Sequence, residues 1–79
     1  MGTMSYKIRV PDLLKRLNLR PIDLVRLTTI AVDTAYKAAD EKRADEITLD
    51  TALKIYNGLK ENGYEIDWSD VVEFRKNGQ

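Results

Sequence analysis

The 79-residue sequence predicts an all-α domain, a compact bundle of five short helices. Apolar residues recur at helical spacing, first in the leucines of segment 13–17 and again on one face of segment 49–59. Helix boundaries are marked as well, because Thr48 is a good N-cap and the Asn-Gly pair at 62–63 is a strong stop. The one alternating segment, 6–10, is too short to form a sheet unless it pairs with another copy.

The first two helices have clear starts. Pro11 and Pro21 each suit a first helical turn, where a missing N–H leaves no hydrogen bond unmade. The second helix ends at residues 28–29, and Ile30 fills the turn that follows with an apolar side chain. The chain therefore predicts a helix-turn-helix at about 20–40.

The third helix, expected from Ala31 to Asp40, divides into two faces at about 100° per residue. Its small face carries Ala31, Thr34, Ala35 and Ala38, and its outer face carries Val32, Asp33, Tyr36, Lys37 and Asp40. We therefore expect a helix that packs by its back and presents its front.

The last two helices carry the remaining apolar surface. The fourth places Leu49, Ala52, Ile55, Tyr56 and Leu59 on one face, and the fifth follows the N-cap Asp67 with Trp68, Val71, Val72 and Phe74. We expect Trp68 and Val71 to fold back into the core. A dimer interface is expected from Tyr64, Ile66, Val72 and Phe74. A domain of this size is marginal alone and gains stability by forming a homodimer.

Composition argues against several classes of protein. Cysteine and histidine are both absent, which removes thiolate metal sites and the commonest general base. We expect no metal, no cofactor, no catalytic residue, no small-molecule substrate and no membrane association, and a cytoplasmic protein. One domain is expected over 1–79, with residues 1–5 an expression tag or disordered arm and residues 76–79 frayed.

Net charge is zero, but the charges are unevenly distributed. Residues 1–28 hold six basic and two acidic side chains. Residues 29–46 and 47–79 are each acidic, with five acids against three bases and six against four. The positive end of the chain therefore includes the first two helices.

The order of these segments resembles the lambda-repressor-like, or XRE, helix-turn-helix family of prokaryotic and phage regulators. The second-helix motif of that family, L-T-x-x-[DE]-L-A-x-L-T-G, aligns without a gap on Leu19, Asp23, Leu24, Leu27 and Thr28. Segment 48–54 is similar to its phrase S-L-D-T-A-L-K, and segment 63–72 to its ending G-x-x-[IVL]-x-x-L-L. The resemblance covers roughly residues 8–74.

Several positions depart from the family pattern. Arg20 stands in place of a capping Thr or Ser, and Pro21 in place of a Gln that touches DNA. Thr29 replaces the glycine of the turn, so the turn either has another geometry or is strained. Ala35 and Ala38 replace large aliphatic residues, and we expect Tyr6, Ile8 or Trp68 to fill that volume.

The resemblance implies that the front of the third helix enters the major groove of double-stranded DNA. By position, the base-contacting residues are then Val32, Asp33, Tyr36 and Lys37. The alternative is a solvated face on which Asp33 and Lys37 form an ordinary surface ion pair. Phosphate contacts are expected from Arg20, Arg26, Lys42 and Arg43, each of which is otherwise a solvated charge.

The leading hypothesis is a sequence-specific DNA-binding transcriptional regulator, a dimeric repressor that blocks an operator. The second is a helix-turn-helix module that binds other proteins in place of DNA, such as an antitoxin-like or scaffold module. Neutral charge and the departures at Pro21 and Thr29 favour the second. An enzyme is the third, and it has little support without histidine, cysteine or a phosphate-binding loop.

Overall fold

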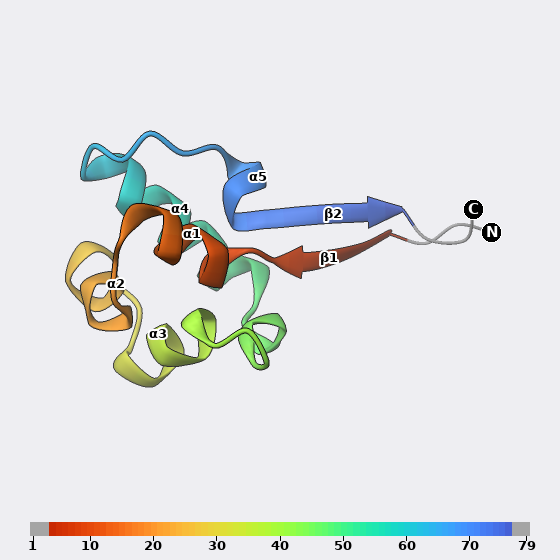
Figure 1. Ribbon diagram of the computed structural model, residues 1–79, viewed down its shortest axis with the longest axis horizontal. Helices are drawn as coiled ribbons and strands as arrows, with labels where there is room; N and C mark the ends of the chain where they lie inside the picture. The colour runs from red at the N-terminus through yellow and green to blue at the C-terminus, as the bar shows by residue number, and fades with distance from the viewer. Residues whose placement is uncertain (1–3, 77–79) are drawn as a thin grey trace.

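The computed structural model describes the backbone of residues 4–76 and the side chains of residues 6–74. A helical body carries a two-stranded sheet that projects from one end (Figure 1). In chain order the elements are β1 (Met4–Ile8), α1 (Val10–Leu17), α2 (Pro21–Leu27), α3 (Val32–Ala39), the 3-10 helix η1 (Ala44–Glu46), α4 (Leu49–Glu61), α5 (Trp68–Val71) and β2 (Val72–Lys76). The five predicted α-helices are present, and the all-α prediction is wrong at both ends of the described chain.

The sheet joins the two ends of the chain in an antiparallel pair, with Ile8 opposite Val72 and Tyr6 opposite Phe74. Segment 6–10 was expected to need another copy for pairing, and Phe74 was expected in the last helix. Both expectations are wrong, because α5 ends at Val71 and the chain continues as a strand. Ile8 and Val72 are both buried, and pairing the two segments as strands brings both side chains to the core, because a strand directs alternate side chains to one face.

The chain ends also differ from expectation. Strand β1 includes Met4 and Ser5, which were assigned to a disordered arm over residues 1–5. Strand β2 reaches Lys76, the first residue of the segment expected to fray. Residues 1–3 and 77–79 lie outside the described residues.

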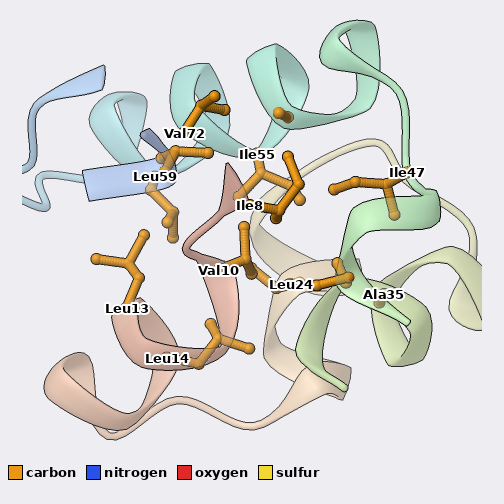
Figure 2. Packing of buried hydrophobic residues seen from close by; sticks show 14 of the residues in the cluster. Ile8, Val10, Leu13, Leu14, Leu24, Ala35, Ile47, Ile55, Leu59 and Val72 are labelled. Atoms are coloured by element: carbon orange, nitrogen blue, oxygen red, sulfur yellow. The ribbon is translucent and has the colours of Figure 1, made fainter. Parts of the chain in front are cut away.

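The core lies where α1, α2 and α4 meet the inner ends of both strands (Figure 2). Val10, Leu24, Ile55 and Leu59 are fully buried there. Helix α4 supplies two of these residues and thereby forms the centre of the domain. Leu49, expected on the same face of α4, is instead exposed.

Close packing of α3 against its neighbours accounts for the small side chains of Ala35 and Ala38. Ala35 and Ala38 are fully buried, and α3 packs against α1, α2 and η1. Of the three residues expected to fill the volume, Ile8 is buried in the same core cluster. Tyr6 is exposed, and Trp68 packs edge-on against the ring of Tyr56, with 5.6 Å between centroids. Small residues here bring helices together and leave less volume to fill.

The predicted helix boundaries are confirmed at α4. The Thr48 hydroxyl accepts a hydrogen bond from the amide of Thr51 at 3.1 Å, and Gly63 takes a left-handed φ of +90°. At α2, Arg20 offers no side-chain acceptor, and its own amide donates to the Asp23 carboxylate at 2.8 Å. No helix among the described residues is both long and apolar enough to cross a membrane.

Candidate nucleic-acid interface

A four-residue turn, 28–31, connects α2 to α3. The Thr28 hydroxyl donates to the carbonyl oxygen of Leu24 at 2.6 Å and accepts from the amide of Ile30 at 3.4 Å. Ile30 is buried, as its role of apolar plug predicted. Thr29 does not have a positive φ. Among the described residues, Asn18 is the one non-glycine residue with a positive φ. The turn therefore follows a geometry that needs no glycine at position 29.

Helix α3 has the two predicted faces except at Ala31, which was expected on the packed face and is instead the exposed N-cap residue. Ala35 and Ala38 are fully buried, whereas Val32 is 50% exposed and Tyr36 54% exposed. Asp33 is exposed beside them. The front of α3 is therefore open to solvent along its first turns, on a helix whose back is held by the core. This arrangement lets side chains meet a partner without rearrangement of the backbone.

Lys37 lies at the edge of this front and is half-buried. Its Nζ is 3.9 Å from a carboxylate oxygen of Glu46, and the other oxygen of that carboxylate is 3.7 Å from Nε of Arg43. The alternative pair of Asp33 with Lys37 is not formed among the described side chains. Glu46 follows Arg43 by three residues, which is the spacing of a helical ion pair. One carboxylate thus sits against two cations of the candidate interface.

The other cations expected to meet phosphate have different surroundings. Arg20 is exposed at the start of α2 and lies 3.7 Å from Asp23. Lys42 is exposed in the loop after α3, where its amide donates to the Asp40 carboxylate at 2.9 Å. Both positions flank the α2–α3 unit and leave a charged side chain facing solvent.

Arg26 lies in the last turn of α2 and has different neighbours. It lines a shallow groove between the end of α2 and α4, together with Leu27, Thr28, Thr29, Lys54, Asn57, Gly58 and Glu61. The structure therefore brings Lys37, Lys42 and Arg43 together along the end of α3 and the loop that follows, and it places Arg26 beside α4.

Hydrogen-bonded ion pairs hold α1 against its neighbours. Nζ of Lys15 lies 2.9 Å from Glu41 in the loop after α3, and that hydrogen bond raises the pKa of Lys15. Nη1 of Arg16 lies 3.1 Å from Asp70 of α5, and that hydrogen bond raises the pKa of Arg16. The Lys15 contact therefore ties the loop after α3 to α1, and the Arg16 contact ties α5 to α1.

The expected dimer interface is corrected by burial. Ile66 and Val72 belong to the protein's own core and are 4% and 1% exposed, so their side chains leave almost no surface for another copy. Tyr64 is half-buried against the same core, and Phe74 remains exposed. Val71 is fully buried and Trp68 is partly buried against the core, as predicted.

Within the described residues, no group of three or more Asp, Glu, His or Cys side chains has the arrangement of a metal site. The chain matches no protein-family model, no curated protein and no solved structure at a significant level. The function must therefore be inferred from α3 and the charges around it.

Proposed function

We propose that this protein is a small sequence-specific DNA-binding regulator that inserts α3 into the major groove. The observation that carries the proposal is the division of α3 into a fully buried back at Ala35 and Ala38 and an open front at Val32 and Tyr36. A helix held in this way by a preceding helix and a short turn is the recognition element of helix-turn-helix proteins. The sequence resemblance to lambda-repressor-like regulators supports the same assignment.

The front of α3 offers chemistry suited to base edges. Lys37 can donate to O6 and N7 of guanine, and Asp33 can accept from N4 of cytosine. Val32 can pack on a thymine methyl group, while Tyr36 can reach sugar or phosphate. Exposure of Val32, Asp33 and Tyr36 leaves these groups available. A repressor of this kind acts by steric occupation of its operator and needs no cofactor.

Phosphate contacts come from Lys42 and Arg43 beside α3 and from Arg20 at the start of α2. Zero net charge and the carboxylate of Glu46 weaken the general attraction for DNA. We therefore expect modest affinity for each protomer and a salt dependence at the lower end for this class. Useful affinity then requires two protomers on one site.

A second candidate is a protein-interaction module that uses the same face. Val32 and Tyr36 are large apolar side chains at about half exposure, which suits a protein partner as well as DNA. The neutral charge of the chain favours this candidate.

Selection of genomic fragments by the purified protein, followed by sequencing, tests the proposal. Enrichment of a common sequence at low salt is expected, and Lys37→Ala should lose about tenfold in affinity for it while relaxing preference at one base pair. Lys60→Ala on α4 removes the same charge outside the interface and should keep the preference. If no sequence is enriched and Lys37→Ala behaves as the wild type, α3 does not contact bases and the protein-interaction candidate replaces the proposal.

A further inference from the structure

The hydrogen-bond pattern of the sheet determines which backbone groups face outward. The amide of Arg9 donates to the carbonyl oxygen of Val71 at 2.7 Å, and the amide of Val72 is used within α5. Ile8 and Val72, the next pair outward, are therefore a non-hydrogen-bonded pair. Such pairs alternate in an antiparallel ladder, so Tyr6 and Phe74 are another. The N–H and C=O groups of Tyr6 and Phe74 consequently point away from the ladder, toward the two outer edges.

The two outer edges of the sheet differ. On β1, the outward amide of Ile8 donates to the carboxylate of Asp45 at 3.1 Å, and η1 lies beside the strand. This contact covers the inner end of that edge, and natural sheets commonly have their edges covered in this way. On β2, no group of the described residues hydrogen-bonds to the outward N–H and C=O of Phe74. The edge of β2 is therefore open at its centre.

The apolar face of the sheet also extends past the core. Ile8 and Val72 are buried, but Tyr6 and Phe74, on the same face one step outward, are 39% and 48% exposed. Their rings lie 6.2 Å apart and form a small aromatic cluster. The two strands that carry these residues project from the helical body (Figure 1). A lone pair of strands is marginally stable in water, so this sheet gains from further strands.

We propose that a second copy of this chain pairs with the open edge of β2, antiparallel, on a two-fold axis at Phe74. The two outward-facing Phe74 residues then exchange N–H to C=O hydrogen bonds across the axis and complete a four-stranded sheet. The interface is isologous, as in most dimers. This dimer forms without DNA, so the test of the interface is independent of the test of the proposed function.

Charge along β2 favours this register, although the carboxylate of Glu73 already pairs with Arg9 of its own copy. With the axis at Phe74, Glu73 of one copy lies opposite position 75, an arginine in the sequence, of the other. Moving the axis one residue either way places Glu73 opposite Glu73 or Arg75 opposite Arg75. Like charges directly opposite each other destabilise a pair of strands, whereas opposite charges stabilise it. The register centred on Phe74 is therefore the complementary one.

The same register continues the aromatic cluster across the axis. The Phe74 rings of both copies fall side by side on one face, flanked on each side by Tyr6. Aromatic cross-strand neighbours stabilise a sheet, and they cover surface that a single copy leaves exposed. Antiparallel pairing also places the two helical bodies at opposite ends of the sheet, since each body lies at the inner end of its own strands (Figure 1).

Sedimentation equilibrium of the full chain without DNA, up to several hundred micromolar, tests the interface with two matched variants. Phe74→Pro and Tyr6→Pro each remove one ring and one outward amide, and neither removes a bond of the existing ladder. Wild type should dimerise, and Phe74→Pro should dimerise at least about tenfold more weakly because both symmetric hydrogen bonds are lost. Tyr6→Pro should dimerise more strongly than Phe74→Pro. A monomeric wild type overturns the proposal, as does equal or greater loss in Tyr6→Pro.

Hydrogen exchange of the wild type provides a test that needs no variant. The Phe74 amide should exchange more slowly as protein concentration rises, because the dimer buries it in a hydrogen bond. The Tyr6 amide lies on the opposite edge and should exchange at a rate independent of concentration. An unchanged rate at Phe74 over a concentration range in which the protein dimerises would place the interface elsewhere.

Discussion

Gly58 of α4 lies against the carbonyl oxygen of Leu27, the last residue of α2. A Cβ atom at position 58 would stand 2.6 Å from that oxygen and 2.6 Å from Cγ2 of Thr28. The absence of a side chain thus lets α4 approach the point where α2 ends and the turn to α3 begins. The position of the candidate recognition helix depends on this contact, because the turn is held from behind by α4.

Gly58→Ala should lower the free energy of unfolding by about 1–3 kcal/mol, since the extra methyl group must displace backbone. Alanine is the better helix former, so the sign of the effect separates crowding from helix propensity. Chemical denaturation measures it. Asn57→Ala, one residue earlier on the exposed side of α4, is the control and should change stability by less than about 0.5 kcal/mol. A stabilised Gly58→Ala would contradict the close approach of α4.

Asn62 joins the same two helices through its side-chain amide. Nδ2 donates to the carbonyl oxygen of Leu27 at 3.2 Å and to that of Gly58 at 2.7 Å. Asn62→Asp keeps the shape but has no donor and brings a negative charge to two carbonyl oxygens. It should cost about 1–2 kcal/mol of unfolding free energy in thermal or chemical denaturation. Asn57→Asp, the same exchange at an exposed position of α4, is the control and should cost much less.

Local signals in the sequence were sufficient for much of the fold and of α3. The packed back of α3, the plug Ile30 and the N-cap Thr48 were predicted because each depends on residues a few positions apart. The sheet was missed because it pairs residues 4–8 with 72–76, almost the whole chain apart. Apolar alternation in so short a segment does not identify a distant partner.

The candidate site likewise combines local features that the sequence predicts with distant contacts that it does not predict. Exposure of Val32, Asp33 and Tyr36 follows from helical periodicity alone. The pairing of Lys37 with Glu46 does not, because the path of the chain through η1 brings that carboxylate back to the helix. Burial of Ile66 and Val72 also depends on distant contacts, which is why both were mistaken for interface residues.

Acid should weaken the fold partly through Asp70. A hydrogen bond from Arg16, and then one from the amide of Asp67, lowers the pKa of the Asp70 carboxyl. The folded protein therefore binds this proton less readily than the unfolded chain. Asp70 contributes stability above the ordinary carboxyl pKa of about 4, and that contribution is lost as pH falls through the lower folded value.

Denaturation of Asp70→Asn as a function of pH measures this contribution. The variant should be less stable than wild type at neutral pH, and its stability should fall less steeply below about pH 4. Glu65→Gln removes an exposed carboxylate that has no ion pair among the described residues, and it serves as the charge-matched control. Parallel acid limbs for wild type and Asp70→Asn would show that the Arg16–Asp70 contact does not contribute.

Removal of the Glu46 charge tests the electrostatics of the proposed DNA interface. Glu46 lies 3.9 Å from Nζ of Lys37 and 3.7 Å from Nε of Arg43, so its carboxylate opposes phosphate where both cations would contact DNA. Glu46→Gln should bind DNA more tightly than wild type, with a salt slope steeper by up to about one unit. Titrations at several salt concentrations measure both quantities. Glu65→Gln changes net charge equally, so a general charge effect would appear in both variants. If the two gain equally, or if neither gains, Lys37 and Arg43 do not lie at the DNA surface and the proposed orientation of α3 is wrong.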